Sequence, residues 1–207
     1  MNCGTTRIIG ERNGRPVLSA IEKSPVDSVT VFFGSLCIEG DVQTNHKVHG
    51  GPDQAVCAYS ADHWPWWREE RNFDCAEGSF GENLTVLGAD EDSLGIGDRF
   101  QWGDVVLEVT QPRGPCANVD LRHGRSDLAQ IMTQSVRCGW YMRVVREGTA
   151  PARDAMIACT KPEDRPSIRD AFAARYDTRL PPSFRQGVRD HPALGIRWRQ
   201  AIARTFA

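Results

Sequence analysis

The sequence has 207 residues, of which 40% are hydrophobic and 25% are charged, a composition typical of a soluble globular protein. Its formal net charge is -2, which argues against a general nucleic-acid binder or a protein of anionic membrane surfaces, because both depend on excess Lys and Arg. No apolar run approaches the roughly 20 residues of a membrane-spanning helix. The first residues also lack the basic and apolar segments of a signal peptide, so we expect a cytoplasmic protein.

Seven cysteines occur at irregular spacings, and no C-x-x-C pair is present. The odd count and the irregular spacing argue against a disulfide framework and fit a reducing compartment.

In chain order, the first part of the sequence is dominated by short strand-like runs separated by Gly and Pro. Residues 6–11 and 16–21 flank the turn signal Asn13-Gly14, and Gly103-Asp104 is a second two-residue hairpin loop with Gly first, as a type II′ turn requires. Many short strands with this punctuation predict a barrel or a sandwich. The remaining predicted strands cover residues 29–33, 55–59, 99–102 and 105–110.

Two helices interrupt the strand-rich part. Ser60 is placed to cap a helix over residues 61–71, and Ser126 to cap one over residues 127–134. The first helix carries the aromatic side chains His63, Trp64, Trp66 and Trp67. These form either a binding platform or, as we expect, a surface that packs the helix on the barrel, because basic residues do not interleave with them.

The composition changes near residue 150. We predict a strand-rich domain over residues 1–150, a proline-containing connector over 151–166, and a small three-helix domain over 167–207. The three helices are expected at residues 167–175, 182–189 and 195–206. Trp198 and Phe206 on the last helix suit either a core or the interface of a homodimer.

Cys116 lies on a loop just after the predicted strand 105–110, where two prolines and a glycine restrict the backbone. The nearby Arg113 favours the thiolate form of Cys116, which suits a soft metal ligand or a nucleophile, and its planar fork suits a phosphate. The alternative is a cysteine that acts as a small buried apolar residue.

Two further segments have side chains suited to ligand binding. His49, followed by two glycines, suits anion binding or proton transfer, although an incidental surface histidine is the alternative. Asn83, in the turn Gly81-Glu82-Asn83, can recognise the edge of a heterocycle or cap its own turn. A zinc site would use Cys37, His46, His49 and Cys57, but these spacings match no common zinc motif.

Taken together and in this order, the segments resemble the MOSC domain, the molybdenum cofactor sulfurase C-terminal domain, and in particular its bacterial YiiM-like group. The resemblance covers residues 5–150, and the tail from residue 166 is similar to the three-helix domain that accompanies this group. It implies a mainly β, α+β fold, a distorted β-barrel with flanking helices. The motifs that carry it are residues 36–43, 47–56, 80–84, 97–103 and 111–116.

The resemblance implies a positively charged pocket for the molybdenum cofactor, a molybdopterin, with Cys116 as metal ligand. Lys23, His49 and Arg113 would neutralise the pterin phosphate, with His49 also suited to proton transfer, while Asn83 and Asn118 would orient the pterin or the substrate. The sequence departs from the family where a threonine is usual before residues 36–43. Thr30 or Ser35 would have to supply that hydroxyl.

Three functions follow from this resemblance. The first is a molybdenum-dependent reductase of N-hydroxylated compounds, such as hydroxylaminopurines or amidoximes, which receives electrons from a separate reductase because no flavin, haem or iron–sulfur motif is visible. The second is a sulfur carrier or sulfurtransferase with a persulfide on Cys116. The third is a non-catalytic module on the same fold that binds a small molecule. None of the three needs nucleic acid or a membrane.

Overall fold

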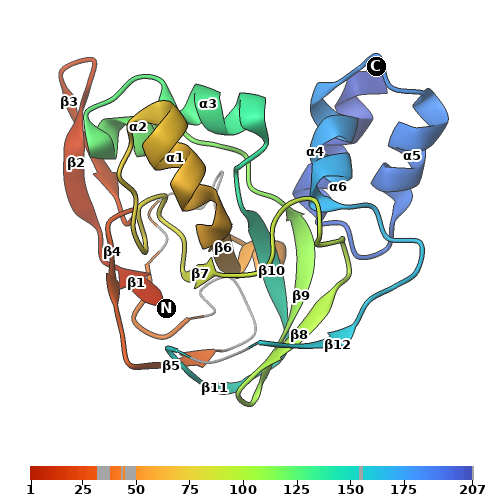
Figure 1. The fold of residues 1–207 in the computed structure, drawn as a ribbon, viewed down its shortest axis with the longest axis horizontal. Coiled ribbons are helices and arrows are strands. Elements are labelled where there is room, and N and C mark those ends of the chain that lie inside the picture. Colours follow the sequence, from red (N-terminus) through yellow and green to blue (C-terminus); the bar gives the residue numbers. More distant parts are fainter. Residues whose placement is uncertain (32–37, 43, 45–49, 154–155, 207) are drawn as a thin grey trace.

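The structure, a computed structural model, describes residues 1–31, 38–42, 44, 50–153 and 156–206. Its largest sheet curls into a half-barrel with the strand order β12-β8-β9-β10-β6-β7, antiparallel throughout except for the parallel pair β6 and β7 (Figure 1). The mixed α+β, barrel-like fold is therefore confirmed. The strands are β6 (Val56–Ser60), β7 (Leu84–Val86), β8 (Arg99–Trp102), β9 (Val105–Pro112), β10 (Trp140–Arg146) and β12 (Ile157–Thr160).

Three further strand pairs lie among the described residues. They join β1 (Asn2–Gly4) to β4 (Lys23–Pro25), β2 (Arg7–Arg12) to β3 (Arg15–Ser19), and β5 (Ser28–Val31) to β11 (Gly148–Pro151). Both predicted hairpins form. Asn13 and Gly14 both have positive φ, whereas at the second turn only Gly103 does, as a type II′ turn requires.

The first predicted helix is split in two. Ser60 caps only a 3-10 turn, η2 (Ala61–His63), by accepting from the Asp62 amide, and α1 (Trp64–Arg71) then begins afresh. Pro65 explains the break, because it has no N–H to continue the first turn and is tolerated at the start of a new helix.

The Ser126 cap was predicted one residue too early. Asp127 is the N-cap of α3 (Leu128–Ser135), and its carboxylate pairs with Arg125 instead of capping the helix. A short helix not predicted from the sequence, α2 (Asn118–His123), fills the stretch after Cys116.

Trp67 confirms the packing interpretation of the aromatic residues. Its side chain is fully buried with Tyr59, Phe73 and Phe80, and its indole N–H donates to the Tyr59 hydroxyl at 2.6 Å. This second core lies under α1, α2 and α3 and is separate from the core inside the barrel.

The last forty residues form α4 (Ile168–Tyr176), α5 (Pro182–Asp190) and α6 (Ile196–Ala203), followed by a 3-10 turn, η3 (Arg204–Phe206). Ser167 caps α4 in a reciprocal capping box with Asp170. Trp198 is buried in the barrel core, while Phe206 remains exposed beside two arginines of α5.

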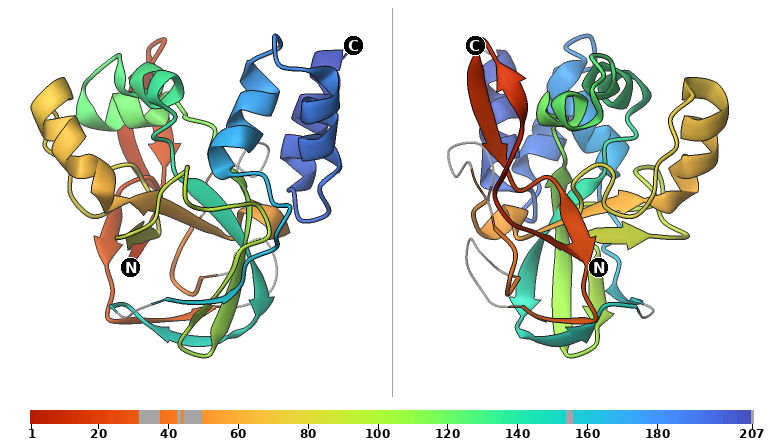
Figure 2. Two further views of the ribbon diagram at one scale, coloured as in Figure 1. Left: turned by 45° about the vertical axis from the view of Figure 1, so that its right-hand side comes forward. Right: turned by 90° about the vertical axis from the view of Figure 1, so that its left-hand side faces the viewer.

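These helices stand at the same end of the barrel as α1–α3 and to one side of them (Figure 2). Strand β12 lies in the predicted connector and pairs with β8, so that stretch contributes an edge strand. The division into domains stays a prediction, although apolar residues of α4, α5 and α6 share one core with the sheet. No helix within the described ranges is both long and apolar enough to cross a membrane.

Candidate functional site

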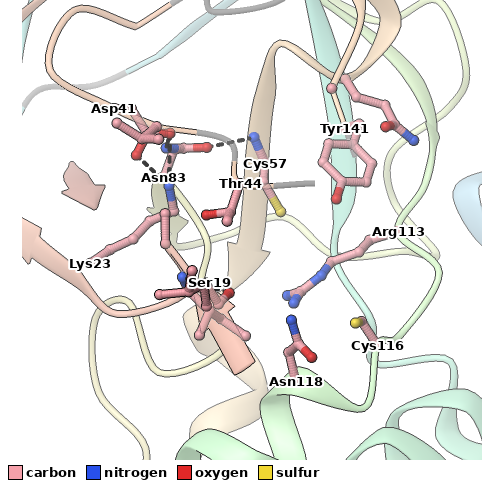
Figure 3. A pocket seen from close by; sticks show the side chains of 17 residues that line it. Ser19, Lys23, Asp41, Thr44, Cys57, Asn83, Arg113, Cys116, Asn118 and Tyr141 are labelled. Carbon is pink, nitrogen blue, oxygen red and sulfur yellow. Dashed lines mark hydrogen bonds and ion pairs between the residues drawn. The ribbon is translucent and has the colours of Figure 1, made fainter. Parts of the chain in front are cut away.

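A pocket, called here the inner pocket, is lined by residues of the N-terminal strands β3 and β4 and by residues after the end of β9. It brings together Lys23, Asn83, Arg113, Cys116 and Asn118, which are all the predicted site residues that the structure describes (Figure 3). His49 lies outside the described residues, as do Cys37 and His46 of the zinc hypothesis. The other lining residues are Leu18, Ser19, Ala20, Ile21, Asp41, Val42, Thr44, Gly50, Gln54, Cys57, Gly81 and Tyr141.

Arg113 is the most informative of these residues. It directly follows β9, where its backbone N–H donates to the Gly139 carbonyl at 2.9 Å, and its side chain points across the pocket towards Asn118 (Figure 3). Only 6% of the residue is exposed, and Nη1 is buried without a hydrogen-bond partner. Within the described part of the chain, no carboxylate forms an ion pair with this guanidinium. Because a buried cation without a partner is unfavourable, the site fits an anionic ligand.

The environment keeps Arg113 charged. Burial is the largest influence and lowers the pKa of its guanidinium. The acidic groups around it, Cys57, Tyr141, Glu82 and Cys116, raise this pKa when they are ionised, so that the net pKa is raised. The positive charge needed to bind a phosphate is therefore retained.

Cys116 lies on the loop between β9 and α2, beside Arg113 (Figure 3). It is half-buried, and its carbonyl accepts from the Val119 amide at 3.0 Å as α2 begins. Asn118 is the first residue of α2 and its Oδ1 accepts from Arg12 at 3.3 Å, which ties the loop to β2. The loop thus holds a thiol and a carboxamide close to the unpaired guanidinium.

A paired cation occupies the opposite side of the pocket (Figure 3). Lys23 Nζ lies 2.6 and 2.7 Å from the two carboxylate oxygens of Asp41, and both side chains are almost fully buried. Asp41 also accepts from the Gly4 amide. Since Asp41 neutralises Lys23, the excess positive charge of the described lining comes from Arg113.

Asn83 has a structural role that sequence reasoning left open. Its Oδ1 accepts from the Cys57 amide at 3.1 Å, and its Nδ2 donates to Asp41 and to the Asn2 carbonyl. Both amide hydrogens are therefore occupied, and Asn83 joins β1, β6 and the Lys23–Asp41 pair at the pocket wall.

The turn before Asn83 is held by Glu82, which was not singled out from the sequence. Its buried carboxylate accepts from the Gly78 and Phe80 amides and from the Thr85 hydroxyl, at 2.7 to 3.0 Å. Burial raises the pKa of Glu82 above its ordinary value.

Sequence reasoning also missed Tyr141 and Gln111. A β-bulge shifts the register between β9 and β10 at Tyr141, which faces Gln111, whereas the next residue pairs with Val109. Bulges re-aim side chains next to functional sites. Burial raises the pKa of the Tyr141 phenol, with a further increase from Cys57, so its hydroxyl remains protonated and able to donate. No sequence signal distinguished this tyrosine from others in strands.

The hydroxyl that the resemblance called for is not supplied by Thr30. Thr30 pairs with Thr149 between β5 and β11 and is absent from the pocket lining, while Ser35 lies outside the described residues. Ser19 and Thr44 line the pocket instead.

Comparison with known proteins places this geometry in a family. The MOSC domain matches residues 45–157. The chain is 35% identical to protein YiiM of Escherichia coli over 83% of its own length and 76% of that protein. It is also 32% identical, over 75% of its length, to a protein named Reductase from Gibberella moniliformis, of which the match covers 28%.

The solved structures agree. The crystal structure of YiiM from Geobacillus stearothermophilus superimposes with a TM-score of 0.82 at 29% identity, covering 100% of this chain and 97% of the other. The match includes α4, α5 and α6 as well as the barrel. The chain belongs to the MOSC domain family.

Proposed function

We propose that this protein is a molybdenum-cofactor-dependent reductase of N-hydroxylated compounds. The observation that carries the proposal is the buried guanidinium of Arg113, without an ion-pair partner in the described part of the chain and beside the half-buried Cys116 thiol. A cation of this kind fits the phosphate of a pterin cofactor, and a thiolate is a ligand that suits a soft metal centre. The relative named Reductase supports a reductive reaction.

Each residue of the inner pocket would have a separate role in holding the cofactor. Arg113 would bind the cofactor phosphate through its planar fork, with Lys23 as a weaker, already paired cation and His49 as a further donor. Cys116 would ligate the metal. Asn118 would orient the pterin, and Asn83 would hold the pocket wall through the bonds described above.

When bound, the cofactor would supply the two-electron chemistry that the protein's own side chains lack. The balanced reaction is R–NHOH + 2 e⁻ + 2 H⁺ → R–NH₂ + H₂O, in which the N–O bond breaks and the oxygen leaves as water. The electrons would come from a separate electron-donating reductase. Tyr141, kept protonated by burial, is placed to donate a hydrogen bond into the pocket.

The test is the Cys116→Ser variant, produced in a host that makes the cofactor. We expect molybdenum content and turnover of a hydroxylaminopurine each to fall at least roughly tenfold, because a neutral hydroxyl is a poor soft ligand. Cys159→Ser, at an exposed position of β12, is the matched control and should retain both. Full metal content together with full turnover in Cys116→Ser would rule the assignment out.

The exposure of part of the Cys116 side chain also supports the second candidate, a sulfur carrier. That function predicts sulfur released from Cys116 by cyanide and no molybdenum in the same preparation. The binding-module hypothesis predicts no reduction even after cofactor loading.

A further inference from the structure

A second and larger pocket, called here the outer pocket, lies between the loop that carries Cys116 and helices α4 and α6. Its volume is about 640 Å³, within the range of about 300 to 1,000 Å³ typical of small-molecule sites. It shares Gln54, Cys116 and Tyr141 with the inner pocket, so the same thiol lies on the wall between the two. The other lining residues are Gln111, Gly114, Pro115, Arg175, Tyr176, Arg197, Trp198, Gln200, Ala201 and Arg204.

The outer pocket is strongly cationic. Three arginines line it, at positions 175, 197 and 204, and its described lining contains no carboxylate, although the whole chain has a net charge of -2. Neither Arg175 nor Arg204 forms an ion pair with any carboxylate in the described ranges. A concave surface lined by one sign of charge concentrates ligands of the opposite sign.

Arg175 is held in a fixed orientation. Its guanidinium stacks on the rings of Trp198 and Tyr176, with centroid distances of 4.5 and 4.8 Å. The Trp198 ring is itself fixed, because its N–H donates to the Ala171 carbonyl at 2.8 Å. A stacked guanidinium keeps its N–H edge available, which suits a phosphate better than a mobile lysine would.

Two buried amide side chains also line the outer pocket. Gln54 and Gln111 are buried, and the Oε1 atom of each lacks a hydrogen-bond partner in the described structure. Gly195, just before α6, packs so closely on Gln111 that a Cβ atom there would overlap its Oε1. Because an unpaired buried acceptor is costly, both carboxamides fit a ligand that carries N–H donors, such as a heterocyclic base.

We propose that the outer pocket is the substrate site and that its substrate is an N-hydroxylated purine nucleotide, recognised through its phosphate. The phosphate would lie against Arg175 and Arg204, the base against Gln54 and Gln111, and the N–OH group towards Cys116. This assignment rests on the proposed function, and it adds an anionic group to the substrate class.

The first experiment compares two substrates of the cofactor-loaded protein, 6-hydroxylaminopurine and its ribonucleoside 5′-monophosphate. We expect kcat/KM to be at least roughly tenfold higher for the nucleotide, as charge-assisted hydrogen bonds to phosphate predict. Arg204→Gln and Arg175→Met should each raise KM for the nucleotide at least roughly tenfold and raise KM for the free base much less. Arg179→Gln, an exposed arginine paired with Asp177, is the matched control and should change neither.

The second experiment measures binding without turnover. Titration calorimetry of the same proteins with adenosine 5′-monophosphate, adenosine and inorganic phosphate should give the tightest binding for the nucleotide, weaker binding for phosphate alone, and loss of both in Arg204→Gln. Equal binding of nucleotide and nucleoside, or nucleotide binding that is unchanged in both arginine variants, would overturn the proposal. Arginine-dependent nucleotide binding without reduction of either substrate would uphold the pocket assignment and contradict the proposed function instead.

Discussion

Two arginines, one in β10 of the half-barrel and one just past the end of the neighbouring β9, have opposite surroundings. Arg143, in β10, forms ion pairs with Asp53 at 2.9 Å and Glu108 at 3.1 Å, and it donates to the Ala193 carbonyl before α6. Arg113, just past the end of β9, is more deeply buried and has no such partner among the described residues.

The presence or absence of carboxylate partners distinguishes a cation that stabilises the fold from one that is suited to bind a ligand. Arg143 satisfies carboxylates from two segments and joins the barrel to the segment that leads into α6. Burial removes water from the Arg113 guanidinium, and in the ligand-free fold no carboxylate among the described residues compensates for that loss. A cation kept under these conditions is best explained by an anion that enters the site.

Replacement of Arg113 should give the largest functional effect. We expect Arg113→Met to lower molybdenum content by at least roughly tenfold, because the cofactor phosphate loses its main cation. Stability should stay the same or rise by about 1 kcal/mol, since the variant removes an unpaired buried charge. Metal analysis and urea denaturation measure the two effects. If Arg113→Met were strongly destabilised and kept normal metal content, Arg113 would be a structural residue and not a ligand-binding one.

Replacement of Arg143 should give the opposite result. We expect Arg143→Met to lower the free energy of unfolding by about 2 kcal/mol, because Asp53 and Glu108 lose their shared partner while solvent partly compensates. Metal content of the folded fraction should stay near that of the wild type. Equilibrium urea unfolding is the measurement, and an unchanged midpoint would show that this arginine is not structural.

Replacement of Lys23 should have effects on metal content and stability that are intermediate between those of Arg113→Met and Arg143→Met. We expect Lys23→Met to reduce molybdenum content less than Arg113→Met does, because Asp41 already neutralises this lysine. The variant leaves Asp41 without its cation, so stability should fall by about 1 to 2 kcal/mol. Metal analysis beside urea unfolding would test the ranking, which fails if Lys23→Met loses as much metal as Arg113→Met.

Among these replacements, Glu82→Gln should have the smallest effect on stability, and this effect should depend on pH. Its folded pKa is raised by burial, so the folded state binds the proton more tightly than the unfolded state does. The associated stability is present below the ordinary pKa of glutamate and is lost as pH rises through the raised pKa. Relative to Glu82→Gln, the wild type should therefore lose stability across that window. Urea unfolding at several pH values measures the difference, and a pH-independent difference would contradict it.

The sequence predicted the parts of the fold that depend on local signals. The hairpins at Asn13-Gly14 and Gly103-Asp104 and the three C-terminal helices follow from turn chemistry and periodicity, and all are present. The restart of the helix at Trp64 follows from Pro65, a signal that the sequence prediction overlooked. The one-residue shift of the α3 cap accompanies the pairing of Asp127 with Arg125, which spacing alone does not show.

The candidate site was predicted through the motif resemblance, which pointed to Cys116, Arg113 and Lys23. The structure adds what motifs cannot give, namely which cations are already neutralised. Lys23 and Arg113 have the same charge in a sequence, but only the structure shows Asp41 beside one of them. Gln111 and Tyr141 were missed because the sequence has no clear signal for the bulge beside them or for their places in the pocket lining.

The tight packing of Gly195 on Gln111 has a consequence for the evolution and engineering of selectivity. Position 195 lies outside the lining of both pockets, yet any larger side chain there would press on Gln111 or move the start of α6. Gln111 lines the outer pocket, so the shape of that pocket depends on a residue outside its lining. We expect a larger residue at position 195 to change which ligands fit without any change in the chemical groups around Cys116.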